Sequence, residues 1–133
     1  MIDASVFVDA LVVLGEGGDA ARLELLGEPA LQVPTTFLPE TVSALRGLVR
    51  RGDLSPIRAV TAIQEARSLR VVEYSFEPFF RRVWELRDNL SVYDAFYVAL
   101  AEALDTALVT CDDKLLQAPG PRCRRRRPRE AGL

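Results

Sequence analysis

Four acidic residues stand where carboxylates could do chemistry together: Asp3, Glu40, Asp94 and Asp112. Each of them also has a purely structural explanation. Three are placed at or near predicted helix starts, where a short acidic side chain accepts hydrogen bonds from free backbone N–H groups. Glu40 follows Pro39 in a first helical turn, where a negative charge suits the helix dipole. The prediction of a site therefore depends on all four acids together.

The four acids are predicted to meet at one edge of a sheet. Asp3 and Asp112 each follow a predicted parallel strand, and Glu40 and Asp94 lie in first turns of helices that begin from the same edge. In open α/β sheets, ligands bind at this carboxyl edge. Four carboxylates gathered there would repel one another and have raised, coupled pKa values. A divalent cation would remove that repulsion.

The donor atoms in the chain favour a hard cation. The sequence contains no histidine and only two cysteines, Cys111 and Cys123, which excludes His-dependent nucleophilic catalysis and the usual zinc sites. Oxygen ligands alone select Mg²⁺ or Mn²⁺, with water completing the coordination. Such a site best serves phosphodiester hydrolysis, where the ion activates water and neutralises charge on the phosphate.

Two other classes of acidic site fit poorly. The opening letters MIDAS match the acronym of an integrin-type metal site, whose motif is Asp-x-Ser-x-Ser, but Phe7 occupies the last position of that motif. A phospho-acceptor receiver domain also uses an acidic pair such as Asp112–Asp113. That class needs its pair after the first strand and a lysine after the last, whereas here the pair comes late and Lys114 follows it directly.

Bulk properties predict one domain over residues 1–133. The chain is 49% hydrophobic and 27% charged, as in an ordinary globular protein. No apolar run approaches the ~20 residues of a membrane span. No secretion signal is recognisable at the N-terminus. We therefore expect a cytoplasmic protein with reduced thiols and no membrane association.

Charge is distributed unevenly along the chain. The net charge is −2, yet the last fourteen residues, GPRCRRRRPREAGL, hold six arginines and one glutamate. A basic end on an acidic body indicates an anionic partner for that end. From about residue 120 we expect either a basic edge strand or a solvated tail, because proline and arginine make a poor strand.

Apolar, strand-like segments alternate with segments of helical period, which predicts an α/β fold around a parallel sheet. Strands are expected at residues 1–3, 30–34, 70–74 and 106–110. Asp19 is the expected N-cap of the second helix and Gly27 its end; Ser55 and Pro56 are expected to begin the fourth. The helices are expected at residues 4–14, 20–27, 35–52, 54–69, 75–89, 91–105 and 112–119.

Three segments of the chain resemble a known family. They are IDASVFVDAL, LPETVSALRGLVRRGDL and NLSVYDAFYVALAEALDTALVTCDDKLL. They are similar to a PIN domain and, more narrowly, to the VapC toxins of bacterial type II toxin–antitoxin pairs, and the resemblance covers about residues 1–120. It implies a three-layer α/β/α fold with a short, mainly parallel central sheet. It also implies a Mg²⁺- or Mn²⁺-dependent ribonuclease.

The resemblance assigns roles to individual residues. The family's acidic quartet maps onto the four acids named above. Family members carry Thr-x-Asp after the fourth strand, so TCD at 110–112 favours Asp112 over its neighbour as the last member. Side chains expected to orient the acids, or water bound to them, are Ser5, Ser91, Thr110 and Asp113.

The resemblance also implies partners: an RNA substrate, a VapB-like antitoxin and a second copy of the chain in a homodimer. An acidic pocket repels RNA, so arginines at its rim are expected to bind phosphates. The candidates are Arg46, Arg50, Arg51, Arg124, Arg125, Arg126 and Arg127. Several apolar residues could form a groove for an antitoxin segment, although packing in the core would explain their apolar character equally well. They are Phe76, Phe79, Phe80, Val83 and Trp84.

Two alternatives keep the fold and change the function. One is a PIN-fold nuclease that processes RNA without an antitoxin, and the other is a non-catalytic PIN module that binds RNA or protein. Two features also depart from the family's pattern. Only two residues precede Asp3, so we expect fraying at that edge of the sheet, and CRRRRP replaces the expected apolar edge strand.

Overall fold

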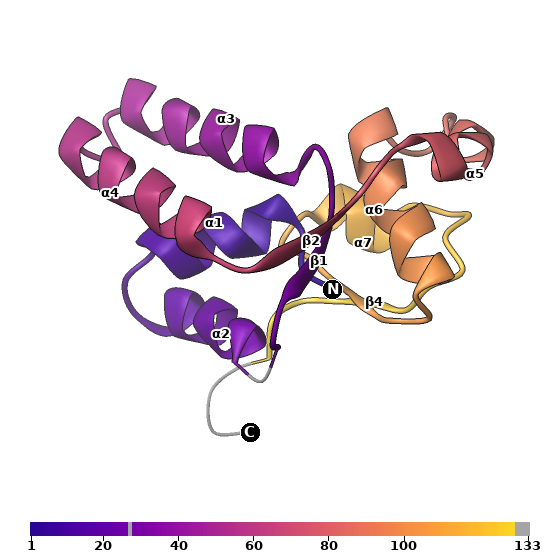
Figure 1. The fold of residues 1–133 in the computed structure, drawn as a ribbon, viewed down its shortest axis with the longest axis horizontal. Helices are drawn as coiled ribbons and strands as arrows, with labels where there is room; N and C mark the ends of the chain where they lie inside the picture. The colour runs from indigo at the N-terminus through magenta and orange to yellow at the C-terminus, as the bar shows by residue number, and fades with distance from the viewer. Residues whose placement is uncertain (27, 130–133) are drawn as a thin grey trace.

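A computed structural model describes residues 1–26 and 28–129 of the chain. Gly27, the predicted end of the second helix, and residues 130–133 lie outside the described residues. Figure 1 shows α1 to α4 on one side of the strands and α5, α6 and α7 on the other. The elements are α1 (Ala4–Val12), α2 (Glu16–Leu25), β1 (Leu31–Pro34), α3 (Phe37–Arg50), α4 (Pro56–Ser68), β2 (Val71–Tyr74), the 3₁₀ helix η1 (Glu77–Phe79), α5 (Phe80–Glu85), α6 (Val92–Ala103), β3 (Leu108–Val109), α7 (Asp113–Gln117) and β4 (Arg125–Arg126).

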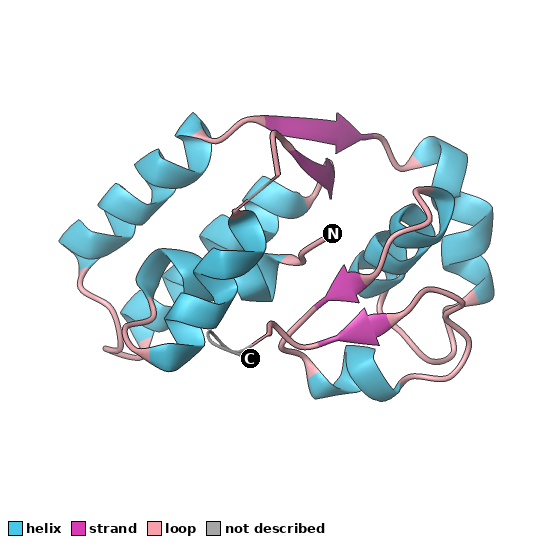
Figure 2. Ribbon diagram, turned by 90° about the horizontal axis from the view of Figure 1, so that it is seen from below, coloured by secondary structure: helices cyan, strands magenta, loops and turns pink. Residues whose placement is uncertain are grey.

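The strands are short and parallel, as predicted. β1 pairs with β2 in the register Leu31↔Val71 to Pro34↔Tyr74, and β3 pairs with β4. Figure 2 shows these two pairs lying apart, with helices around them. Within the described residues, the hydrogen bonding of the sheet is thus divided between two pairs. The α/β class and the parallel strands are confirmed.

The first predicted strand is reduced to a single bridge between Ile2 and Val109. Two hydrogen bonds to Val109 nevertheless hold the backbone before and after Ile2. Asp3 N–H donates to the Val109 carbonyl at 3.1 Å, and Val109 N–H donates to the Met1 carbonyl at 2.8 Å. Ile2 is buried. The expected fraying of this edge is therefore wrong: pairing with β3 fixes the backbone that carries Asp3.

Local chemistry explains where the helices begin. Ser55 caps α4 by accepting a hydrogen bond from Arg58 N–H at 3.1 Å, with Pro56 in the first turn, as predicted. The predicted start of α2 at Asp19 is wrong, since α2 begins at Glu16. Gly15, at φ 85°, turns the chain directly into the helix. Asp19 instead pairs with Arg22 one turn later, at 2.6 Å.

The core is built around α6. Its residues from Ala95 to Ala101 are all buried, so this helix is apolar on every side and lies inside the molecule. Phe7 of α1 packs against Phe37 of α3, with ring centroids 4.9 Å apart. Each fully buried aromatic or aliphatic side chain contributes roughly 2 kcal/mol through its apolar surface. These contacts fix α3 and α6, which carry Glu40 and Asp94, and α1, which Asp3 caps.

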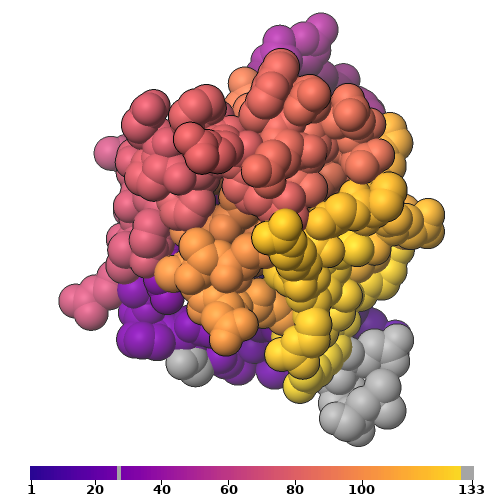
Figure 3. Space-filling view, turned by 90° about the vertical axis from the view of Figure 1, so that its right-hand side faces the viewer, coloured from indigo at the N-terminus to yellow at the C-terminus, as the bar shows by residue number. Residues whose placement is uncertain are grey.

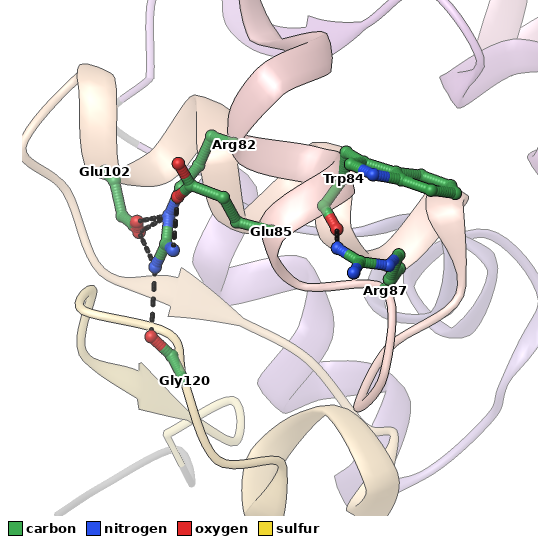
Figure 4. Close-up of polar contacts among 6 residues, drawn as sticks. All are labelled: Arg82, Trp84, Glu85, Arg87, Glu102 and Gly120. Carbon is green, nitrogen blue, oxygen red and sulfur yellow. Dashed lines mark hydrogen bonds and ion pairs between the residues drawn. The ribbon is translucent and has the colours of Figure 1, made fainter.

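The predicted helix over residues 75–89 is split into η1 and α5, with a proline in the first turn of η1. Arg82 of α5 connects this region to α6 and to the segment before β4 (Figure 4). Its guanidinium donates to both carboxylate oxygens of Glu102 at 2.8–3.3 Å, to Glu85 at 3.2 Å and to the Gly120 carbonyl at 3.0 Å. One side chain therefore joins α5, α6 and the segment before β4.

The apolar residues proposed for an antitoxin groove divide between core and surface. Val83 is buried, and Phe79 packs against Phe96 with ring centroids 5.8 Å apart. Phe76 also contacts Phe96, at 5.4 Å, but is 38% exposed. Phe80 and Trp84 are 51% and 61% exposed. Arg87 lies over the exposed Trp84 ring at 4.6 Å, as Figure 4 shows.

Figure 3 shows the C-terminal segment, in yellow, lying along the segments coloured orange and salmon that include α6 and α5.

Over residues 1–26 and 28–129, no helix combines the length and the apolar character that crossing a membrane requires. The cytoplasmic location stays a prediction.

Candidate active site

All four predicted acids line one cavity of about 620 Å³, called here the acid cavity. Asp3 enters it from the N-cap of α1, Glu40 from the first turn of α3, Asp94 from the first turn of α6 and Asp112 from the residue before α7. The structure therefore brings together side chains that lie up to 109 positions apart in the sequence. The other residues that line the acid cavity are Ala4, Ser5, Thr36, Pro39, Ser43, Ala44, Tyr93 and Tyr97.

Asp3 is the most buried of the four acids, with 5% of its surface exposed. One carboxylate oxygen caps α1 by accepting hydrogen bonds from Val6 N–H at 3.1 Å and the Ser5 hydroxyl at 2.5 Å. The other oxygen accepts from the Thr110 hydroxyl. Burial raises the pKa of this carboxyl, although all these hydrogen bonds act in the opposite direction. Asp3 both caps a helix and belongs to the cavity.

Glu40 is half-buried and faces Tyr97 of α6. The Tyr97 hydroxyl donates to the Glu40 carboxylate at 3.1 Å. Burial is the main cause that raises the pKa of Glu40, and the negative charges of Asp94 and Asp3 raise it further. Burial and the facing carboxylates also raise the pKa of Tyr97, so this hydroxyl stays a neutral donor.

Asp94 and Asp112 stand at the starts of two helices, and both line the cavity. Ser91 caps α6 by accepting from Asp94 N–H at 3.1 Å, and Asp112 caps α7 by accepting from Lys114 N–H at 2.9 Å. Burial raises the pKa of Asp94, and the negative charge of Asp112 is the next cause. The Asp112 side chain therefore caps a helix as predicted, whereas Asp94 contributes only its backbone N–H to the Ser91 cap. Both side chains line the cavity.

Of the four predicted orienting residues, Ser5 and Thr110 join Asp3 to the turn that carries Asp112. Ser5 accepts from Cys111 N–H at 3.2 Å while donating to Asp3. Thr110, fully buried, accepts from Asp112 N–H at 3.0 Å while donating to the other Asp3 oxygen. Each hydroxyl therefore fixes one carboxylate oxygen of Asp3.

The remaining orienting candidates lie outside the cavity lining. Ser91 is exposed and acts as the cap of α6, so it positions Asp94 through the backbone. Asp113 is exposed and pairs with Arg127.

Sequence reasoning missed Tyr97 and Thr36. Tyr97 follows Asp94 by three positions on α6, and this spacing places both side chains on one helix face. That signal was available in the sequence. Thr36 precedes α3 and lines the cavity, and its hydroxyl oxygen is buried without a hydrogen-bond partner among the residues that the structure describes. Its sequence context predicts only an N-cap residue.

None of the seven candidate RNA-binding arginines lines the acid cavity. Arg46, Arg50 and Arg51 are exposed on or just after α3, and Arg51 lies 3.6 Å from Asp53. Arg51 also lines a neighbouring cavity of about 520 Å³ that shares Ser5, Ser43 and Ala44 with the acid cavity. Arg124 is exposed. Side-chain contacts within the chain hold Arg125, Arg126 and Arg127.

The lining residues fit a hard divalent cation by their donor chemistry. They offer carboxylate and hydroxyl oxygens, and none of those that the structure identifies is basic. Across the described ranges, no three acidic or cysteine side chains converge closely enough to enclose an ion by themselves.

The chain is similar in sequence to proteins of one known family. The PIN domain family profile matches residues 1–121. The chain is 40% identical over 123 residues to the ribonuclease VapC9 of Mycobacterium tuberculosis, covering 92% of this chain and 93% of that protein. It is 35% identical over 120 residues to the ribonuclease VapC12 of the same organism, covering 90% and 92%.

Two solved structures share the fold. PAE2754 from Pyrobaculum aerophilum superposes with a TM-score of 0.67 at 23% identity, covering 94% of this chain and 81% of that one. VapC20 of Mycobacterium tuberculosis, a toxin that cleaves the sarcin–ricin loop, superposes with a TM-score of 0.63 at 19% identity, covering 86% and 90%. At these identities the two structures bear on the fold alone.

Proposed function

Because the chain belongs to the PIN-domain family and, within it, to the VapC ribonucleases, we propose that it cleaves RNA as the toxin of a VapBC-type pair, with Asp3, Glu40, Asp94 and Asp112 as its catalytic acids. The observation that carries the assignment of the acids is their arrangement in one cavity. Three of them have pKa values raised by burial, and each of Glu40 and Asp94 is raised further by neighbouring carboxylates. Such a site gains most from a cation.

Divalent-metal dependence is general in this family, and we propose Mg²⁺ or Mn²⁺ for this chain. Asp3, Asp94 and Asp112 would hold the ion directly or through water, and Glu40 would complete the set. When bound, the ion supplies a water of lowered pKa and neutralises charge that develops on the phosphate. The cavity lining that the structure identifies includes no histidine or lysine, which leaves carboxylates as the proton acceptors among its side chains.

The chain's own residues prepare the site. Ser5 and Thr110 fix the two oxygens of Asp3, which keeps this carboxylate aimed into the cavity. Tyr97 holds Glu40 from the core side. Asp94 and Asp112 project from helix starts that the packing of α6 and α7 fixes. These contacts restrict the Asp3 and Glu40 side chains before any ion binds.

RNA must approach a cavity that is negative without its ion. We propose that the exposed arginines on α3, Arg46 and Arg50, contact phosphates of the substrate. Contacts of this kind position RNA with little regard to sequence, and they weaken as salt rises.

A VapB-like antitoxin and a homodimer are the proposed protein partners. The family membership supports the antitoxin. Exposed apolar side chains such as Phe80 and Trp84 leave surface for protein contacts. Sedimentation equilibrium measures the homodimer, and co-purification with the product of a small neighbouring gene separates a toxin from an RNA-processing nuclease.

The central test is cleavage of end-labelled total RNA in Mg²⁺, in Mn²⁺ and in EDTA. We expect cuts that require the metal and disappear in Asp94→Asn. Asp88→Asn is the matched control, because Asp88 is an exposed carboxylate in the loop before α6. Equal cleavage by Asp94→Asn would contradict the assigned site, and a folded protein without metal-dependent cleavage would favour a non-catalytic module.

A further inference from the structure

The arginine-rich segment around β4 has a role in the fold that its composition does not predict. Its backbone pairs with β3: Leu108 N–H donates to the Arg124 carbonyl at 2.8 Å, and Thr110 N–H donates to the Arg126 carbonyl at 3.0 Å. Successive side chains of a strand point to opposite faces. Within β4, Arg125 and Arg126 therefore point to opposite faces, and Arg127 directly follows the strand.

Arg126 ties β4 to α2. Its guanidinium donates to both carboxylate oxygens of Glu24, at 2.7 and 3.0 Å, and Arg129 N–H donates to the same carboxylate at 3.0 Å. The side chain of Glu24 is only 13% exposed. The hydrogen bond from Arg126 holds the pKa of Glu24 below its usual range. This bidentate pair fixes where β4 lies along the molecule.

On the opposite face, Arg125 caps the end of α7. It donates to the carbonyl oxygens of Leu115 and Ala118, each at 2.7 Å. The last carbonyls of a helix have no partner inside the helix. α7 is only five residues long, so an outside donor is a large part of its hydrogen bonding.

Arg127 contacts the residues on both sides of Asp112. It donates to the Cys111 carbonyl at 3.3 Å and forms an ion pair with Asp113. The segment from 110 to 114, called here the Asp112 turn, is thus held by Arg127 at its centre and by Arg125 through α7. The same turn carries Thr110, whose hydroxyl donates to Asp3.

We propose that Arg127, together with Arg125 at the end of α7, is a positioning residue that sets the Asp112 turn, so that Asp112 lines the acid cavity while Thr110 holds Asp3. The inference rests on the proposed function, since the place of Asp112 matters only if the acid cavity holds the ion. It differs from the expected RNA contact, because the guanidinium groups are directed at acceptors within the chain.

Three variants separate positioning from RNA binding. Arg127→Gln removes the charge, Arg127→Lys keeps the charge but loses the planar fork, and Asp113→Asn removes the partner while leaving the arginine in place. Arg122→Gln is the matched control, an exposed arginine of the same segment. Mn²⁺ affinity is measured by calorimetry on the full chain. kcat, KM and the salt dependence of binding are measured on an RNA oligonucleotide that the parent cleaves.

If the arginines position the turn, all three variants weaken Mn²⁺ binding and lower kcat by about tenfold, the scale expected for partners of metal ligands. KM for RNA stays within about twofold, because no phosphate contact is lost. Arg122→Gln behaves as the parent. Should Arg127→Gln fail to fold, Asp113→Asn decides, since the Asp113 side chain is 70% exposed and tolerates the change.

The opposite pattern overturns the proposal. An RNA contact predicts that Arg127→Lys stays close to the parent. It also predicts that Arg127→Gln raises KM and lowers the slope of log affinity against log salt by about 0.7, the value for one phosphate of a single strand. Unchanged Mn²⁺ affinity in all three variants overturns the positioning role and leaves the proposed function standing. A parent that binds Mn²⁺ no better than Asp94→Asn overturns the proposed function and this inference with it.

Discussion

The acid cavity contains carboxylates without basic partners, whereas elsewhere in the molecule carboxylates are paired with arginines. In the cavity, four carboxylates lie together, and the lining that the structure identifies contains no basic side chain. Around α5, α6 and β4, by contrast, arginines meet carboxylates in the pairs Arg82–Glu102, Arg126–Glu24 and Arg127–Asp113. Matched charges hold elements in place, and unmatched charges leave a position open for a ligand.

Removing an acid from the cavity has the largest expected effect on activity. Asp3→Asn keeps the shape of the side chain but cannot accept from both Ser5 and Thr110 while also binding a cation. We expect kcat to fall by more than about 100-fold, beyond the loss typical of a partner of a metal ligand. Single-turnover cleavage in Mg²⁺ measures this. Circular dichroism shows whether the variant is folded, and near-parental kcat would refute the role of Asp3.

Breaking a matched pair has a large effect on stability instead. Arg82→Met leaves Glu102, whose side chain is 15% exposed, without its bidentate partner, and also frees the Gly120 carbonyl. We expect a loss of about 2 kcal/mol in the free energy of unfolding by urea, less than for a fully buried pair. Adding Glu102→Leu should recover part of it. Arg81→Met, an exposed neighbour, is the control, and an equal loss there would contradict the importance of the pair.

The unmatched acids predict an unusual pH dependence for the metal-free protein. Asp3, Glu40 and Asp94 have raised pKa values, so the folded chain binds their protons more tightly than the unfolded chain does. Their contribution to stability is present below the ordinary carboxyl pKa and is lost as pH rises through the raised values.

Thermal unfolding in EDTA checks this contribution by comparing the parent with Glu40→Gln. At neutral pH we expect the variant to melt about 3 °C higher, because it removes one carboxylate from the cluster. The advantage should vanish as pH falls below the ordinary carboxyl pKa, because Glu40, with its raised pKa, is then protonated in the parent. Mg²⁺ should stabilise the parent more than the variant. A difference that does not depend on pH would contradict carboxylate repulsion as its cause.

The smallest expected effect distinguishes two tyrosine hydroxyls. Tyr97→Phe removes the donor to Glu40, and Tyr74→Phe removes a donor to Gln32 at 2.5 Å on the exposed surface. We expect Tyr97→Phe to lower kcat and Mn²⁺ affinity by about threefold to tenfold, the equivalent of one net hydrogen bond. Tyr74→Phe should change neither. Equal effects of the two changes would show that Tyr97 acts only through packing.

Positions of the acids could be predicted because each depends on short-range signals. Asp94 belongs to a capping pattern with Ser91, and Asp112 directly follows a strand and begins a helix. Such signals predict where an element ends, and the ends of parallel strands lie on one edge. The start of α2 was predicted wrongly, since a glycine at positive φ, rather than the acid that follows, begins the helix.

The partners of the arginines could not be predicted in the same way. A run of four arginines indicates only charge, and its composition suits a tail, an RNA contact or a set of ion pairs equally. Arg126 meets Glu24 from 102 positions away, and Arg127 meets Asp113 only because β4 pairs with β3. The division of the sheet into two hydrogen-bonded pairs likewise depends on packing between distant elements.

The sequence by itself determined the α/β class, the exclusion of histidine chemistry and the choice of four acids that line one cavity, because residue types and local periodicity fix them. Only the tertiary structure decided that Tyr97 supports Glu40, that Thr110 joins Asp112 to Asp3, and that Arg125 and Arg127 are directed at the chain itself. The physical reason is range. Hydrogen bonds and ion pairs form between side chains that folding brings within about 3 Å, whatever their separation along the chain.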